Sequence, residues 1–264
     1  MTKTIALGKA RIGKGKRVYA IGDIHGCLAE LKKLWKLIHK DLREHPVDKY
    51  RVIFIGDYVD RGPDCKGVID QLITWKNDGE NITFLRGNHE TKLIKIFSDA
   101  DKKSLPGFIK YGGPETLASY GLTAETFAKI LGEDPQSKNY EKLSATVKKH
   151  LGKTHVKFLN ALKTSTREGD YFFCHAGVDV TRKLNDQDDH DLIWMREPFL
   201  SWDQPLQKVV VHGHTPRSQP QALCHRINID TGCVYGRELT AVALEGKSHR
   251  FLKVKAKARY RKGN

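Results

Sequence analysis

The chain has 264 residues, of which 39% are hydrophobic and 29% are charged, as is usual for a globular protein. This composition excludes collagen-like, coiled-coil and disordered chains, and no apolar run approaches the roughly 20 residues that a membrane helix needs. The formal net charge of +15 first suggests a nucleic-acid-binding protein.

The excess charge is concentrated at the two ends of the chain. Residues 1–22 contain six Lys and Arg and no acid, residues 246–264 contain eight and no acid, and the segment between them has a net charge of +1. Basic chain ends of this kind are most often simply solvated. The functional alternative is that they weakly attract polyanions. We expect one domain over residues 1–264, with a basic arm at 1–16 and a basic tail at 246–264.

The first half of the chain alternates strand and helix patterns. Short apolar runs predict buried strands over 17–21, 51–55 and 82–85. Between them, apolar residues at helical spacing predict two helices, with Leu28, Leu31, Leu34, Trp35 and Ile38 in the first and Val68, Ile69, Leu72, Ile73 and Trp75 in the second. This β-α-β-α-β order predicts an α/β fold.

The second half begins with a more polar helical stretch from about residue 91 to 164, punctuated by glycines and prolines. We interpret this stretch as a helical cap inserted into the domain. Strand patterns return over 171–174, 209–211, 227–229 and 240–244, and the last of them are expected to form a second sheet layer. Residues 250–257 alternate polar and apolar side chains, which predicts a final strand with outward lysines.

The five cysteines are scattered and form no CxxC pair: Cys27, Cys65, Cys174, Cys224 and Cys233. Such a set predicts free thiols in a reducing compartment and argues against cysteine-bound zinc. The N-terminal residues lack the apolar core of a secretory signal. We therefore expect a cytoplasmic protein. We also expect a monomer that does not contact membranes.

Immediately after each of five predicted strands, the chain has polar side chains that can bind metals. They are Asp23 and His25, Asp57 and Asp60, Asn88 and His89, His175, and His212 and His214. Active sites of α/β folds lie at the carboxyl ends of strands, so these side chains are expected to converge. Their oxygen and nitrogen donors suit Mn, Fe or Zn, and there are enough of them for two ions bridged by a carboxylate.

All of these residues except His212 lie in five short blocks, which occur in this order along the chain: Gly22-Asp23-Ile24-His25-Gly26, Gly56-Asp57-Tyr58-Val59-Asp60-Arg61-Gly62, Gly87-Asn88-His89-Glu90, His175-Ala176-Gly177 and Gly213-His214-Thr215. The blocks resemble the signatures of the phosphoprotein phosphatase family, within the calcineurin-like metallophosphoesterases. The resemblance spans residues 18–244. It implies an α/β (α+β) fold with a two-layer central β-sandwich flanked by helices.

The resemblance also implies a role for each matching residue. Two divalent ions are expected, manganese first and iron or zinc as alternatives, with Asp23 and His25 on the first ion, Asp57 as a bridge, and Asn88, His175 and His214 on the second. His212 is interpreted as a buried supporting residue rather than a ligand.

The catalytic residues follow from the same resemblance. His89 is expected to protonate the leaving oxygen and Asp60 to orient it, because a carboxylate partner keeps an imidazole charged. Arg61, Arg196 and Asn88 are expected to hold the phosphoryl oxygens. For Arg196 the alternative is a solvent-facing arginine in an acidic loop.

The expected function is that of a serine/threonine protein phosphatase, with dual specificity as a second option, which hydrolyses phosphoproteins by direct attack of a metal-bridging hydroxide. The string Leu85–Glu90 favours this reading. The segment Ile227–Gly236 is instead similar to bacterial and phage phosphatases and to tetraphosphatases. The enzymatic alternative is therefore a symmetrical dinucleoside tetraphosphatase or an RNA-end pyrophosphohydrolase. A non-catalytic polyanion-binding module is disfavoured because no ligand position is missing.

Overall fold

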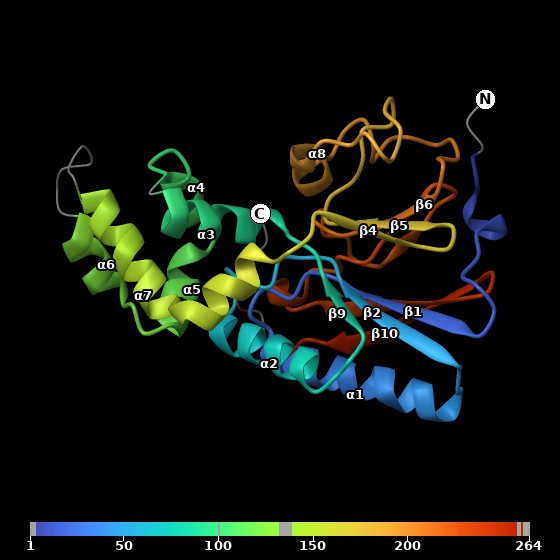
Figure 1. Ribbon diagram of the computed structural model, residues 1–264, viewed down its shortest axis with the longest axis horizontal. Helices are drawn as coiled ribbons and strands as arrows, with labels where there is room; N and C mark the ends of the chain where they lie inside the picture. Colours follow the sequence, from blue (N-terminus) through green and yellow to red (C-terminus); the bar gives the residue numbers. More distant parts are fainter. Residues whose placement is uncertain (1–3, 100, 132–138, 258–259, 261–264) are drawn as a thin grey trace.

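The computed structural model describes residues 4–99, 101–131, 139–257 and 260, and two mixed sheets form its centre (Figure 1). The first sheet has the order β10 (Ser248–Lys255), β9 (Glu238–Glu245), β1 (Lys16–Ile21), β2 (Lys49–Phe54) and β3 (Ile82–Phe84). The second has the order β4 (Ser165–Glu168), β5 (Tyr171–Cys174), β6 (Val209–His212), β8 (Arg226–Asn228) and β7 (Gln221–Ala222).

Helices cover the outer faces of both sheets. In Figure 1, α1 (Leu28–Glu44) and α2 (Cys65–Asn77) lie below the first sheet, and α8 (Asp189–Trp194) lies above the second. Five further helices gather at one end of the molecule: α3 (Asn88–Asp99), α4 (Leu105–Lys110), α5 (Gly113–Ser119), α6 (Ala124–Leu131) and α7 (Asn139–Asn160). They occupy the stretch in which we expected a helical cap. Short 3-10 helices are η1 (Leu7–Lys9) and η2 (Cys233–Tyr235).

The period of two along each strand explains the layering. In β1, Val18 and Ala20 join a core shared with Tyr171 and Phe173 of the second sheet. The alternate side chains Tyr19 and Ile21 belong instead to the core that contains the helix residues predicted for α1 and α2. The sheets therefore pack face to face with helices outside, and the predicted two-layer sandwich is confirmed.

Three neighbouring strands of each sheet run parallel: β1, β2 and β3 in the first, and β5, β6 and β8 in the second.

One expectation about sheet membership was wrong. The strand predicted over 240–244 is β9, which pairs with β1 in the first sheet rather than contributing to the second. Its apolar side chains alternate between the two cores, with Ala241 and Ala243 on the helix side and Val242 and Leu244 between the sheets. A strand that is apolar on both faces suits a central position.

The basic ends are partly folded onto the domain. Leu7, Ala10 and Ile12 are buried in the core between the sheets, although the basic residues Lys9 and Arg11 lie between them in the sequence. The predicted final strand is β10, which forms an edge of the first sheet. Residues 1–3, 258–259 and 261–264 of the predicted arm and tail lie outside the described residues, as do residues 132–138 of the expected cap. Among the described helices, none has the length and apolar character required to cross a bilayer.

Candidate metal centre

The predicted ligands converge where the parallel strands of both sheets end. Asp23 and Asp57 follow β1 and β2, and Asn88 opens α3. Across the sandwich, the backbone N–H of His214 lies 3.1 Å from Asp23 Oδ2. His175 Nε2 lies 3.4 Å from Asp57 Oδ1. The two layers therefore contribute to a single cluster.

The backbone at this cluster is strained. In the part of the chain that is described, every non-glycine residue with positive φ is a predicted site residue: His25 (45°), Asp57 (54°), Asp60 (71°), Arg61 (71°) and His214 (63°). Such conformations are unfavourable for residues with a Cβ and persist only where the surroundings impose them. Glycine is required where the loops touch, because a Cβ at Gly87 would overlap the Asp57 carboxylate.

Asp57 lies at the centre of the donor set. Two groups of side chains with metal-ligand spacing share it: His25, Asp57 and His89, and Asp57, His175 and His214. Asp57 Oδ2 is 3.4 Å from His25 Nε2. A carboxylate common to two groups is the arrangement expected of a bridging ligand.

The imidazoles are oriented as metal ligands. His25 Nδ1 lies 2.8 Å from Val59 O, and His175 Nδ1 lies 3.0 Å from Ile55 O. When Nδ1–H donates to a carbonyl, the lone pair of Nε2 faces the cluster, which is how metal-binding histidines are usually held. His175 Nε2 and His214 Nδ1 both lie near Asn88 Oδ1, at 3.0 and 2.9 Å.

Burial shifts the pKa values of these groups in the direction that favours the neutral form of each side chain. It raises the pKa of Asp57 to about 7 and lowers that of His175 to about 4. The pKa of Asp23 is also raised, by burial and then by the charges of Asp230 and Asp57, and burial lowers the pKa values of His25 and His214. Carboxylates packed this closely are costly without cations, and neutral imidazoles are the form that binds metals. The residues therefore fit two divalent ions.

The predicted acid and its partner are in contact. His89 Nδ1 lies 2.6 Å from Asp60 Oδ2, and both residues are buried. Thr116 of α5 donates its hydroxyl to Asp60 Oδ1 at 2.6 Å and accepts the Asp60 N–H at 2.8 Å. The helical stretch thus fixes the carboxylate that orients His89.

Two buried acids in this region, Glu90 and Asp230, lie in segments noted in the sequence but were given no predicted role. Glu90 accepts backbone N–H groups of Gly87, Asp57, Tyr58 and Val59, and so ties the second block to the third. Asp230 follows β8, and burial raises its pKa to about 6. Its position directly after a buried strand is the same signal that identified Asp23 and Asp57.

An open cleft of about 850 Å³ extends from the cluster. Its lining includes the predicted phosphate ligands Arg61 and Arg196, as well as residues that sequence analysis did not select: Lys92, Tyr111, Trp194, Tyr235 and Arg237. Cations and rings lie close together in it. Lys92 Nζ is 4.3 Å from the centre of the Tyr111 ring and 4.9 Å from that of Trp194, and Arg61 Cζ is 5.7 Å from that of Tyr235.

Arg61 reaches into the centre itself, because its Nη1 lies 2.7 Å from His25 Nε2. Arg196 follows α8 and is exposed at the cleft. His212 is buried away from the cleft and contacts Arg226 at 3.3 Å, as expected of a supporting residue.

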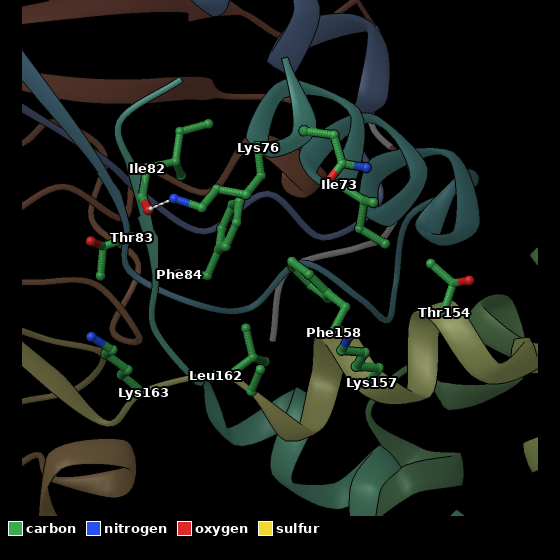
Figure 2. A pocket seen from close by; sticks show the side chains of 12 residues that line it. Ile73, Lys76, Ile82, Thr83, Phe84, Thr154, Lys157, Phe158, Leu162 and Lys163 are labelled. Carbon is green, nitrogen blue, oxygen red and sulfur yellow. Dashed lines mark hydrogen bonds between the residues drawn. The ribbon is translucent and has the colours of Figure 1, made fainter. Parts of the chain in front are cut away.

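A second groove, of about 490 Å³, lies between α2, β3 and α7 (Figure 2). Phe84 and Phe158 form its apolar wall, with ring centres 5.0 Å apart, and Lys76 donates to Ile82 O at 3.2 Å. None of the predicted catalytic or metal-binding residues lines it.

Comparison with known proteins gives consistent matches. A family model described as calcineurin-like phosphoesterase matches residues 16–247. Bis(5'-nucleosyl)-tetraphosphatase PrpE (asymmetrical) of Oceanobacillus iheyensis is 27% identical over 244 residues, which cover 85% of this chain and 87% of the relative. The protein of the same name from Anoxybacillus flavithermus is 29% identical over 240 residues, covering 84% and 88%.

Solved structures share the fold. A candidate diadenosine tetraphosphatase superposes with a TM-score of 0.59 at 22% identity, over 91% of this chain and 93% of that one. A cold-active protein tyrosine phosphatase also gives 0.59, at 16% identity over 96% and 83%. A serine/threonine phosphatase of Saccharomyces cerevisiae gives 0.53, at 15% identity over 92% and 81%.

Proposed function

Because the chain belongs to the calcineurin-like phosphoesterase family, we propose that it hydrolyses the phosphoanhydride chain of dinucleoside polyphosphates and cuts that chain asymmetrically. This proposal adopts the enzymatic alternative of the sequence analysis rather than the expected protein phosphatase. It also replaces the symmetrical cut considered there, because the relatives above are named asymmetrical.

The observation that carries the proposal is the composition of the cleft beside the metal centre. Four cations line it, Arg61, Lys92, Arg196 and Arg237, and three aromatic rings lie among them. A single phosphoryl group needs only part of this charge. A chain of four phosphates can contact all of it, and the rings of Tyr111, Trp194 and Tyr235 offer stacking surfaces for nucleobases.

The chain's own residues divide the work. Asp23, His25, Asp57, Asn88, His175 and His214 are positioned to hold two divalent ions, which when bound would activate water and neutralise phosphate charge. Arg61 and Arg196 bind oxygens of the phosphoryl group under attack, while Lys92 and Arg237 bind the phosphates further along. His89, held at Nδ1 by Asp60, presents Nε2 to the departing oxygen and donates a proton there.

The test is a substrate comparison with purified protein in Mn²⁺. Diadenosine tetraphosphate, a phosphoserine peptide and an aryl phosphate are compared by kcat/KM, and the nucleotide products are separated. We expect the highest value for diadenosine tetraphosphate, with ATP and AMP as products and no turnover after chelation. ADP as the sole nucleotide product would contradict the asymmetric cut, and a preference for the phosphopeptide would contradict the proposal as a whole.

Cleft variants separate binding from chemistry. Arg237→Gln is expected to raise KM for diadenosine tetraphosphate about tenfold, because one charge-assisted contact is lost, and to leave the aryl phosphate unaffected. Arg182→Gln is the matched control, since Arg182 is half-exposed and paired with Asp179 outside the cleft. If both variants change KM for diadenosine tetraphosphate equally, Arg237 does not bind the substrate and the substrate site does not reach this part of the cleft.

A further inference from the structure

Beside the metal centre, three buried side chains form a second cluster with metal-ligand spacing. Cys27 precedes α1, Glu30 lies in its first turn, and Cys233 opens η2. One ligand atom from each lies within 4.8 Å of the other two. All three side chains are almost completely inaccessible, at 1%, 0% and 1% exposure.

The carboxylate of Glu30 is only partly satisfied. Its Oε1 accepts the backbone N–H of Lys257 at 3.1 Å. Its Oε2 is buried and has no hydrogen-bond partner in the described part of the chain. A buried carboxylate oxygen without a donor is rare in native proteins and calls for a specific explanation, such as an ion.

We propose that Cys27, Glu30 and Cys233 bind a zinc-class divalent ion. Two sulfurs and one carboxylate oxygen are donors that zinc accepts, and three protein ligands are the number found where one coordination position stays open. On binding, both thiols release their protons to solvent, so that two thiolates and one carboxylate hold the ion. The proposal reverses the sequence-based expectation that cysteine-bound zinc is absent, because Cys27 and Cys233 are distant in the chain and adjacent only in the fold.

The site would join two segments that are distant in the chain. Cys27 and Glu30 belong to the start of α1, and Cys233 belongs to η2. Residues after β10 already fasten this region, since Ala256 N–H donates to Arg237 O at 2.7 Å and Tyr260 N–H donates to Val234 O at 3.1 Å. Tyr235 and Arg237 line the cleft. An ion bound here would therefore brace one wall of the cleft without touching substrate.

Cobalt gives a test that does not depend on catalysis. The predicted metal centre offers only oxygen and nitrogen donors, so a sulfur-to-cobalt charge-transfer band in the near ultraviolet reports the cysteine site alone. The metal-free protein, kept reduced by a phosphine, is titrated with Co²⁺ and followed by absorption and by metal content. All proteins carry Cys224→Ser, because Cys224 is the one described cysteine that is not buried.

We expect the band to appear in the Cys224→Ser protein and to persist when Asp57→Asn is added. Adding Cys233→Ser is expected to abolish it and to lower the cobalt content by one ion per chain. Adding Glu30→Gln is expected to weaken Co²⁺ binding at the band at least tenfold. Circular dichroism checks that each variant is folded.

The presence or absence of the sulfur-to-cobalt band in the Cys224→Ser protein tests the proposal even where a further variant does not fold. Absence of the band at Co²⁺ concentrations that fill the metal centre would overturn the proposal. So would a band that survives Cys233→Ser in a folded protein.

Discussion

The imidazole of His89 is held at Nδ1 by Asp60, and its Nε2 lies 3.9 Å from Asp57 Oδ2 of the metal centre. Asp60 Oδ2 lies 2.6 Å from Nδ1, and Thr116 fixes the remaining oxygen of Asp60. A proton delivered by His89 matters most when the leaving oxygen is strongly basic. An alkoxide needs that proton, whereas a phosphate or an aryl oxide leaves well without it.

We therefore predict that the effect of His89→Asn depends on the leaving group. Turnover of a phosphoserine peptide is expected to fall about 10³-fold, and turnover of diadenosine tetraphosphate or an aryl phosphate only about tenfold. Asp60→Asn is expected to show the same pattern at smaller size, because Asp60 acts through His89. Steady-state kinetics on the three substrates, with metal content measured in parallel, tests this. A uniform loss on all three would show that His89 does not act as an acid.

At the scale of single residues, the sequence predicts the centre well where a polar residue directly follows a buried strand. Asp23, Asp57, His175 and His214 all meet this condition, and all lie in the cluster. Asp230 meets it too, but it lies outside the five blocks that carry the predicted ligands. The contact between Thr116 and Asp60 could not be predicted, because it joins residues 56 positions apart through the packing of α5.

Among the secondary-structure elements, α1 is clamped to the first sheet by one carboxylate. Asp41 of α1 accepts from Arg17 of β1 at 3.2 Å, from Arg250 of β10 and from the Tyr19 hydroxyl. Arg17 and Asp41 are buried, at 2% and 8% exposure. Loss of the carboxylate leaves a buried guanidinium with fewer partners, which is costly.

Asp41→Asn is predicted to lower the free energy of unfolding by about 2–3 kcal/mol at pH 7, as measured in urea. The matched control is Glu44→Gln on the same helix, whose exposed pair with Lys40 is worth about 0.5 kcal/mol or less. Similar losses in the two variants would contradict the special role of Asp41.

The same carboxylate predicts a dependence on pH. Burial acts to raise the pKa of Asp41, but hydrogen bonds from Arg250 and Tyr19 and the nearby arginine charges hold it below its usual value. A lowered folded-state pKa stabilises the protein above the unfolded value, about 3.9, and this contribution is lost as the pH falls through the folded value. The difference between wild type and Asp41→Asn should be constant near neutral pH and should shrink below about pH 4.

Element positions were easier to predict than element partners. The apolar periodicity of α1 and α2 and the apolar runs of β1, β2 and β3 placed these elements correctly. Whether β9 joins the first or the second sheet depends on which strand edges remain unpaired after the first strands assemble. The local sequence of β9 does not contain this information. The cleft rings Tyr111, Trp194 and Tyr235 come from three distant segments, so their proximity is a property of the assembled fold.

For the molecule as a whole, the positive charges lie in two places, the cleft and the chain ends, and we expect each to bind a different kind of anion. The cations of the cleft face the proposed substrate, whereas much of the net charge of +15 lies near the chain ends. Lys247, Lys255 and Lys257 are exposed on or beside β10 and do not line the cleft. We propose that these lysines attract polyanions and take no part in hydrolysis.

Replacing these three lysines by glutamine is predicted to weaken binding of a single-stranded oligonucleotide without changing kcat/KM for the aryl phosphate. Each lysine that contacts a phosphate adds about 0.7 to the slope of log K against log salt, so the slope should become shallower by up to about 2. The matched control removes the same charge from Lys40, Lys66 and Lys129, which pair with acids on helix surfaces. If both triple variants flatten the slope equally, net charge alone governs the attraction, whereas a larger effect near β10 assigns it to this edge of the first sheet.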